Sequence, residues 1–117
     1  GEVIFFEAYR LSNEFNNSTV GDTVEVKSTA DSDGVVPKGV KAVYATLEGR
    51  AAANPGSQLY TSGTGVPNQQ LEIANQVNNV NTVSSGWVSI ESNGDFSISE
   101  VTPFTSVYLY YTGVMLR

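Results

Sequence analysis

The sequence predicts an all-β domain, a jelly-roll-like, two-sheet antiparallel β-sandwich. Short runs alternate apolar and polar residues with period two, turn-forming residues separate these runs, and apolar residues at helical spacing are scarce. Seven or eight short strands joined by turns are typical of two packed antiparallel sheets. At 117 residues the chain is long enough to bury one core, so we expect a single domain over residues 1–117.

The first expected strand covers residues 3–11 and carries apolar side chains on both faces. Period-two alternation assigns one face to Val3, Phe5, Tyr9 and Leu11, and the other face to Ile4, Phe6 and Ala8. A strand with two apolar faces is expected to lie between two layers of the protein.

Turn-forming residues separate the next two expected strands. Residues 23–27 alternate cleanly and predict a half-buried strand, and the turn sequence Asp-Ser-Asp-Gly follows at 31–34. A second turn, at 36–39, combines a proline that fixes φ with a glycine that tolerates positive φ. It leads into a strand over residues 40–48. One face of that strand carries Val43, Ala45 and Leu47, and the other carries Ala42, Tyr44 and Thr46.

Residues 51–85 are the least regular part of the pattern. Glu72 is their only charged residue, and prolines, glycines and amide side chains are frequent. Because a structureless loop of this length is unusual in a compact domain, we expect short strands at 58–61 and 70–74. A helix over residues 71–77 is the competing prediction, since Leu71, Ala74 and Val77 also fit helical spacing.

The stretch WVSIESNGDFSI, residues 87–98, predicts a hairpin. A two-residue Asn-Gly loop would send the apolar residues of its two strands to opposite faces, whereas a three-residue loop at 92–94 with a bulge aligns them. The aligned register pairs Ile90 with Phe96 and Val88 with Ile98, all facing the core. Trp87 then falls on the opposite, polar face, where some other group must cover its indole.

The last expected strand, residues 107–116, is the longest. One of its faces carries Val107, Leu109 and Tyr111, and the other carries Tyr108, Tyr110 and Thr112.

Composition excludes several classes of function. The chain has no cysteine and no histidine, which removes disulfide scaffolds, thiolate and imidazole metal sites, and the usual hydrolase triads. Its net charge is −6 and its six basic residues are scattered, so we expect no nucleic-acid partner. The longest apolar run, residues 3–6, is far shorter than a membrane span, so no membrane insertion is expected. The first residue is Gly1 rather than Met, and we expect the chain to be a piece of a longer protein.

Three stretches together resemble a known class of module. They are VPKGVKAVYATL at residues 36–47, GWVSI with NGDF at residues 86–96, and VYLYYTGV at residues 107–114. In this order they resemble the small β-sandwich modules at the tips of bacteriophage tail fibres, tail spikes and head fibres. Those modules open with a VP-x-G-x-x-A-V turn and strand, continue with a W/V-V-x-I…N-G-x-F hairpin and close with a V-Y-x-x-x-x-G strand. The resemblance implies a non-enzymatic protein on the virion surface, a homotrimer that contacts the host or decorates the particle.

Two groups of residues are candidates for ligand contact. The aromatic residues Trp87, Tyr108 and Tyr110 would form a platform on which sugar C–H surfaces stack, and the alternative is burial in a subunit interface. The amides of residues 68–81 carry both donors and acceptors that suit sugar hydroxyls, and the alternative is an uncharged solvated loop. The candidates among them are Asn68, Gln69, Gln70, Asn78, Asn79 and Asn81.

The carboxylates give weaker candidates. The turn at 31–34 lacks the glycine and the acid that an EF-hand would need at Val36 and Ala42, so no metal or other cofactor is expected. Glu91 and Asp95 flank the predicted turn, but a hairpin tip supplies neither the desolvation nor the cleft of a glycosidase. We therefore expect no catalytic residues.

The sequence as a whole favours a tail-fibre or tail-spike tip domain that binds a host-surface glycan. The first alternative is a capsid decoration or head-fibre module whose partner is another virion protein. The second is a carbohydrate-binding module of a secreted enzyme, which would be monomeric with its aromatic residues in one open groove.

Overall fold

A computed structural model describes most of the chain: residues 1–11, 23–27, 32–50, 58–62, 69–74, 77, 79–90, 95–100, 104 and 106–117. Side chains are described for residues 1–11, 32–50, 71–74, 77, 79–90, 104 and 106–117. Within these ranges the protein is all-β, with eight strands and no helix. The strands are β1 (Val3–Arg10), β2 (Thr23–Lys27), β3 (Val40–Arg50), β4 (Gln58–Ser62), β5 (Gln69–Ala74), β6 (Thr82–Ser89), β7 (Asp95–Glu100) and β8 (Ser106–Leu116).

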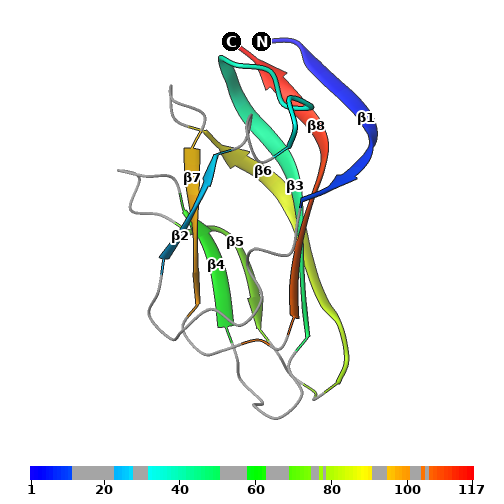
Figure 1. The fold of residues 1–117 in the computed structure, drawn as a ribbon, viewed down its shortest axis with the longest axis vertical. Coiled ribbons are helices and arrows are strands. Elements are labelled where there is room, and N and C mark those ends of the chain that lie inside the picture. The colour runs from blue at the N-terminus through cyan, green and yellow to red at the C-terminus, as the bar shows by residue number, and fades with distance from the viewer. Residues whose placement is uncertain are drawn as a thin grey trace.

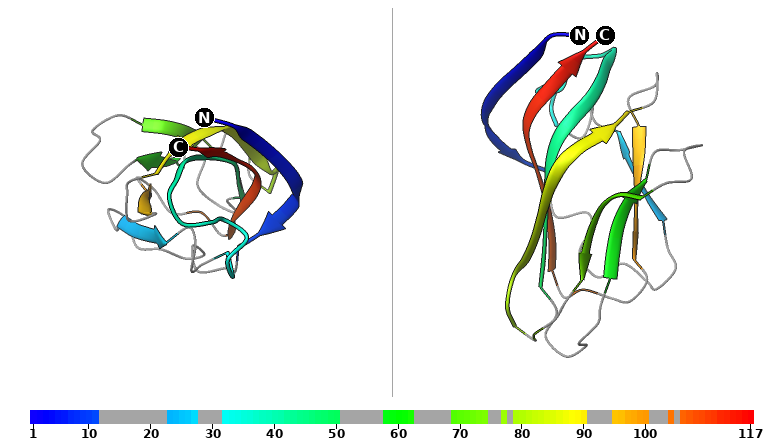
Figure 2. Two further views of the ribbon diagram at one scale, coloured as in Figure 1. Left: turned by 90° about the horizontal axis from the view of Figure 1, so that it is seen from above. Right: turned by 180° about the vertical axis from the view of Figure 1, so that it is seen from behind.

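Four strands form an antiparallel sheet in the order β1-β8-β3-β6, which we call the main sheet (Figure 1). The long strands β3 and β8 lie at its centre, and the amino and carboxyl ends of the chain lie next to each other at one end of it (Figures 1 and 2). The shorter strands pair with one another, also antiparallel, in the order β2-β7-β4-β5. Sequence-distant strands therefore become neighbours in both groups.

The core lies against one face of the main sheet, which we call the inner face. Val43, Ala45 and Leu47 of β3 are fully buried there, and so are Val107, Leu109 and Tyr111 of β8. Leu71 and Ile73 of β5 belong to the same cluster. The alternation predicted for β3 and β8 is thus confirmed. The two short strands predicted in the irregular segment are confirmed as β4 and β5, and the competing helix over 71–77 is wrong because Leu71 to Ala74 are extended.

The two glycine turns before β3 adopt backbone conformations that favour glycine. At 32–35 the Val35 amide donates to the Ser32 carbonyl at 3.1 Å, with φ of 53° at Asp33 and 81° at Gly34. Two consecutive positive φ angles are the mark of a type I′ turn. The buried Ser32 hydroxyl also accepts a 3.0 Å hydrogen bond from the Val36 amide. Gly39 has φ of 82°, as its predicted permissive role requires.

The hairpin predicted between residues 87 and 98 is wrong. Trp87 and Val88 of β6 pair with Tyr44 and Val43 of β3, whereas Phe96 of β7 pairs with Val26 of β2. The chain therefore moves from one group of strands to the other between β6 and β7. Residues 91–94 lie outside the described residues. The inward direction predicted for Val88 and Ile90 is confirmed, as both are buried.

The two-faced arrangement predicted for the first strand is also wrong. Strand β1 lies at the edge of the main sheet, and most of its residues are exposed. Its pairing with β8 shifts register between Phe5 and Tyr9, so that Phe5 lies opposite Gly113 while Tyr9 lies opposite the buried Tyr111. Because of this register shift, period-two alternation does not carry across the strand, and Phe5 and Tyr9 do not lie on the same face of the sheet, although the sequence pattern predicted that they would.

Candidate functional site

The face of the main sheet that is turned away from the core, which we call the outer face, carries the aromatic candidates Trp87, Tyr108 and Tyr110. Cross-strand pairing aligns Phe5 of β1, Gly113 of β8, Tyr44 of β3 and Trp87 of β6 in one row. The row spans all four strands, and its most distant members, Phe5 and Gly113, are 108 positions apart in a chain of 117 residues. Only the folded sheet brings these rings together.

Phe5, Tyr44 and Trp87 form what we call the aromatic cluster. The Tyr44 ring meets the Trp87 ring edge-on, with centroids 5.3 Å apart, and meets the Phe5 ring edge-on at 6.1 Å. The Phe5 and Trp87 centroids are also 6.1 Å apart, with the rings tilted by 44°. These separations lie in the range where aromatic rings attract each other beyond simple area burial. Tyr44 and Trp87 are half-buried, whereas Phe5 remains 65% exposed.

Gly113 makes room for the cluster. A Cβ atom at this position would lie 2.7 Å from Cδ1 and 3.0 Å from Cε1 of Phe5. The Phe5 ring therefore covers the bare backbone of the neighbouring strand. This is the packing by which an aromatic side chain compensates for a strand glycine.

A second and a third row on the outer face carry polar groups beside the cluster. The second row contains Arg10, Tyr110, Thr46 and Ser85, and the hydroxyl oxygens of Thr46 and Ser85 lie 2.8 Å apart. In the third row Tyr108 and Val83 flank Glu48, whose carboxylate accepts a 3.0 Å hydrogen bond from the Asn81 amide. The Arg10 guanidinium carbon lies 5.0 Å from the centroid of the Tyr108 ring. The outer face thus combines ring faces, hydroxyls and one stacked cation.

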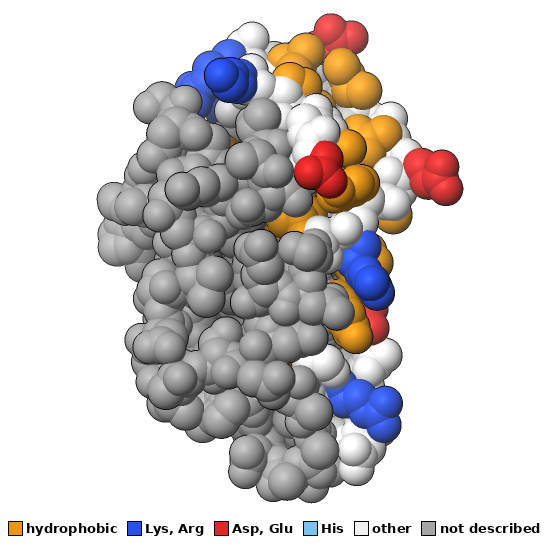
Figure 3. Space-filling model, viewed as in Figure 1, with side chains coloured by type: hydrophobic (Ala, Val, Ile, Leu, Met, Phe, Trp, Pro, Cys, Tyr) orange, Lys and Arg blue, Asp and Glu red, His pale blue; other side chains and the backbone are white. Residues whose placement is uncertain are grey.

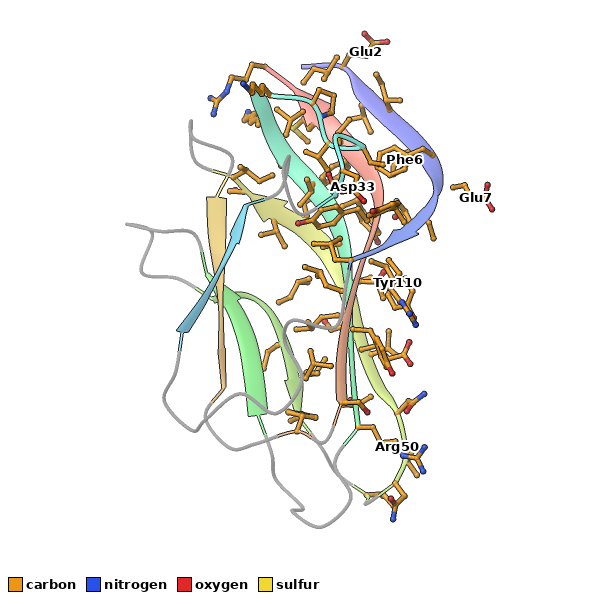
Figure 4. The ribbon with its side chains drawn as sticks, in the orientation of Figure 1. Glu2, Phe6, Glu7, Asp33, Arg50 and Tyr110 are labelled. Atoms are coloured by element: carbon orange, nitrogen blue, oxygen red, sulfur yellow. The ribbon has the colours of Figure 1, made fainter. Side chains whose placement is uncertain are left out.

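Figure 4 shows the direction of these side chains. Tyr110 and Arg50 project away from β2, β7, β4 and β5, on the solvent side of the main sheet. Phe6, in contrast, points from β1 toward the rest of the sheet and packs against the core.

The three aromatic residues predicted as a platform lie on this outer face, but they do not form one group. Tyr108 and Tyr110 lie on β8, and β3 separates them from Trp87 on β6. The direct neighbours of Trp87 are Tyr44 and Phe5, which were not predicted as site residues. Period-two alternation already placed Tyr44 opposite the core-facing residues of its strand, so exposure of its ring was foreseeable, whereas its pairing with Trp87 was not.

Most of the predicted amides lie outside the described residues or side chains. Asn68 and Asn78 are not described, and for Gln69 and Gln70 only the strand backbone is. Asn79 and Asn81 are exposed, and Asn79 has a positive φ of 61°. Asn81 reaches the outer face through its hydrogen bond to Glu48.

Apolar side chains are exposed at both edges of the main sheet. On β1, at one edge, Val3 is 41%, Ile4 is 43% and Phe5 is 65% exposed, and on β6, at the opposite edge, Val83 is 55% exposed. Figure 3 shows hydrophobic side chains gathered along the right side of the molecule, with isolated acidic and basic side chains around them. Patches of this kind mark contact surfaces more often than scattered single residues do.

Tyr9 and Asp33 form a polar contact away from the outer face. The Tyr9 hydroxyl donates a 2.8 Å hydrogen bond to Oδ2 of Asp33, which ties β1 to the type I′ turn. This hydrogen bond, helped by burial and by the negative charge of Asp33, raises the pKa of the Tyr9 hydroxyl above its ordinary value. The contact is an anchor for the edge strand.

Metal-site and membrane features are absent from the described part of the chain. No group of three or more carboxylate, histidine or cysteine side chains there is arranged to hold a metal ion. The described residues also include no helix long and apolar enough to cross a membrane. The Glu91 and Asp95 side chains lie outside the described residues.

Comparisons with known proteins add no relative. No protein-family model matches the chain, and no curated protein has a significantly similar sequence.

Proposed function

We propose that the chain is a non-enzymatic attachment domain of a bacteriophage virion, from a tail-fibre or tail-spike tip, which binds a host-surface glycan through the outer face. The observation that carries the glycan part is the aromatic cluster of Phe5, Tyr44 and Trp87, held on a sheet face that the core does not use. The virion part is carried by the sequence resemblance described above.

A two-sheet, jelly-roll-like sandwich would support such a face. The main sheet and the β2-β7-β4-β5 group would be its two sheets, and Leu71 and Ile73 of β5 already share one core cluster with β3 and β8. Burial against a second layer would hold the main sheet rigid. Binding groups placed on rigid strands keep their geometry better than groups placed on loops.

The chemistry of the outer face suits a sugar. The axial C–H groups of a pyranose are apolar and stack on aromatic rings, while its hydroxyls need donors and acceptors at the rim. The exposed Phe5 ring offers a surface for stacking. The Thr46 and Ser85 hydroxyls and the Glu48–Asn81 pair offer the hydrogen-bonding groups. Ring stacking beside hydrogen-bonding groups distinguishes this face from a purely apolar patch.

The proposed assembly is a homotrimer in which the edge of the main sheet contacts a neighbouring subunit. Val3 and Ile4, both more than 40% exposed on an edge strand, support this. Light scattering after size exclusion is expected to give three times the 12.5 kDa monomer mass, and Ile4→Lys is expected to lower it. A stable monomer at micromolar concentration would remove the trimer and leave the glycan site intact.

Glycan binding is tested on an array of purified bacterial surface polysaccharides. We expect Trp87→Ala to weaken binding to the best polysaccharide at least about tenfold, which corresponds to a loss of roughly 1.4 kcal/mol. The control is Val35→Ala, an exposed valine in the type I′ turn away from the outer face, which should bind as the wild type does. If no polysaccharide binds, or if both variants behave alike, the glycan site is wrong.

A capsid decoration or head-fibre module is the second candidate. The exposed apolar residues of β1 favour it, because such a strip fits another protein better than a hydrophilic glycan. Salt-resistant binding to capsid shells without binding to cells would support this candidate over the first.

A further inference from the structure

Arg10 is the only charged side chain in the two rows that contain and adjoin the aromatic cluster. Those rows hold Phe5, Gly113, Tyr44 and Trp87, and then Arg10, Tyr110, Thr46 and Ser85. The chain as a whole carries a net charge of −6. Arg10 therefore offers one positive charge beside the cluster, with Glu7 exposed on the same strand and Glu48 opposite Tyr108.

The Arg10 side chain is held in place without being neutralised by a described carboxylate. Its guanidinium carbon lies 5.0 Å from the centroid of the Tyr108 ring, within the range of a cation–π contact. Among the described residues it makes no ion pair, and the carboxylate of Glu48 in the third row is engaged by the Asn81 amide instead. Contact with an aromatic ring restricts the guanidinium, while its coplanar N–H groups can still donate to an oxyanion.

The spacing between the cation and the cluster matches groups on successive sugars of one glycan. The Arg10 guanidinium lies at Tyr108, which pairs with Glu48 in the third row, and the four residues from Tyr44 to Glu48 of an extended strand span about 13 Å. An oligosaccharide with one sugar stacked on the Phe5 and Trp87 rings would therefore place a charged substituent of a sugar further along the same glycan within reach of Arg10. The Thr46 and Ser85 hydroxyls lie in the second row.

Building on the proposed function, we propose that the outer face selects an acidic glycan. The Arg10 guanidinium pairs with an oxyanion on the glycan, a carboxylate or a phosphate, while the aromatic cluster stacks on a pyranose ring. A planar guanidinium binds either oxyanion through two parallel hydrogen bonds, which a neutral sugar cannot provide. On a chain of net charge −6, Arg10 supplies the specific charge contact that an acidic glycan would make.

The test measures binding of wild type, Arg10→Gln and Arg10→Lys to the same polysaccharide array. We expect acidic polysaccharides to bind best, Arg10→Gln to weaken that binding at least tenfold, and Arg10→Lys to give an intermediate loss, since lysine keeps the charge but not the fork. The matched control is Arg50→Gln, on the same face of β3 beside Ser106, which should bind as the wild type does. Unchanged circular dichroism and unfolding temperature verify that each variant folds.

A chemical arm identifies the oxyanion. Reducing the carboxyl groups of the best polysaccharide to alcohols is expected to abolish binding if the oxyanion is a carboxylate and to leave it unchanged if it is a phosphate. Preferential binding of neutral polysaccharides, or full binding by Arg10→Gln, overturns the acidic-glycan inference while the glycan function stands. Binding to no polysaccharide at all overturns both.

Discussion

Replacing Gly49 by alanine tests whether the core beside β3 is close-packed. Gly49 lies on the inner face of β3, and a Cβ atom there would come within 2.5 Å of Ile73 Cδ1 and within 2.8 Å of Phe104 Cδ1. Ile73 and Phe104 are 2% and 1% exposed, so neither can move into solvent. Forcing a methyl group into a close-packed core costs about 1–3 kcal/mol.

The expected net effect of Gly49→Ala is smaller than this cost, because alanine lowers the entropy of the unfolded chain by the equivalent of about 0.4–1 kcal/mol. We therefore expect the free energy of unfolding to fall by about 1–2 kcal/mol, and the midpoint temperature by about 4–8 °C for a domain of this size. Circular dichroism during thermal and urea unfolding measures both quantities. The milder comparison is Gly86→Ala, whose Cβ would meet only Leu71 Cδ2, at 3.0 Å.

A double variant separates the clash from any general effect of alanine in the strand. Ile73→Val removes Cδ1, the nearest of the atoms that the new methyl group would meet. Alone it should cost about 0.5–1.5 kcal/mol. Combined with Gly49→Ala it should cost less than the sum of the two single changes, because the two side chains compete for the same space. Strict additivity, or a Gly49→Ala variant as stable as the wild type, would refute this account of the core.

Two further predictions concern β1. Gly113→Ala should displace the Phe5 ring from its place over the glycine. Because that ring is 65% exposed, the free energy of unfolding should fall by less than about 1 kcal/mol, while Trp87 fluorescence changes and glycan binding weakens. A large loss of stability with unaltered fluorescence would contradict this prediction. The pKa of Tyr9 is raised above its ordinary 10.0 by the hydrogen bond to Asp33, so its stabilising effect is present below pH 10 and is lost as pH rises through the folded-state pKa. Wild-type stability should therefore fall more steeply above pH 10 than that of Tyr9→Phe, and parallel curves would show that the hydrogen bond is not formed in solution.

Local patterns predicted the centre of the main sheet well. Strands β3 and β8 alternate over residues 43–50 and 106–113, and the burial of Val43, Leu47 and Leu109 follows because each strand has one face on the core. The short strands β4 and β5 could be predicted because a long structureless segment is uncommon in a compact domain. These elements obey rules that act over a few neighbouring residues.

Predictions that depended on pairing between strands were less accurate. The residues between β6 and β7 are favourable for a hairpin, but Trp87 pairs with Tyr44 instead, and no local signal distinguishes a tight turn from a transfer between groups of strands. Period two also failed across β1, since the register shift after Phe5 depends on its partner strand. The aromatic cluster was missed for the same reason: its rings meet only through the β1-β8-β3-β6 order.

The pairing of Phe5 with Gly113 is itself an argument for function on the outer face. A glycine in the interior of a strand weakens the sheet, and a large exposed ring forgoes the roughly 1.5–3 kcal/mol that full burial would contribute. Stability alone would favour a β-branched residue at position 113 and a polar residue at position 5. The chain instead combines the two less stable choices so that the Phe5 ring lies against Tyr44 and Trp87 on the solvent side. A ring cluster maintained in this way supports the proposal that a partner binds it from outside the subunit.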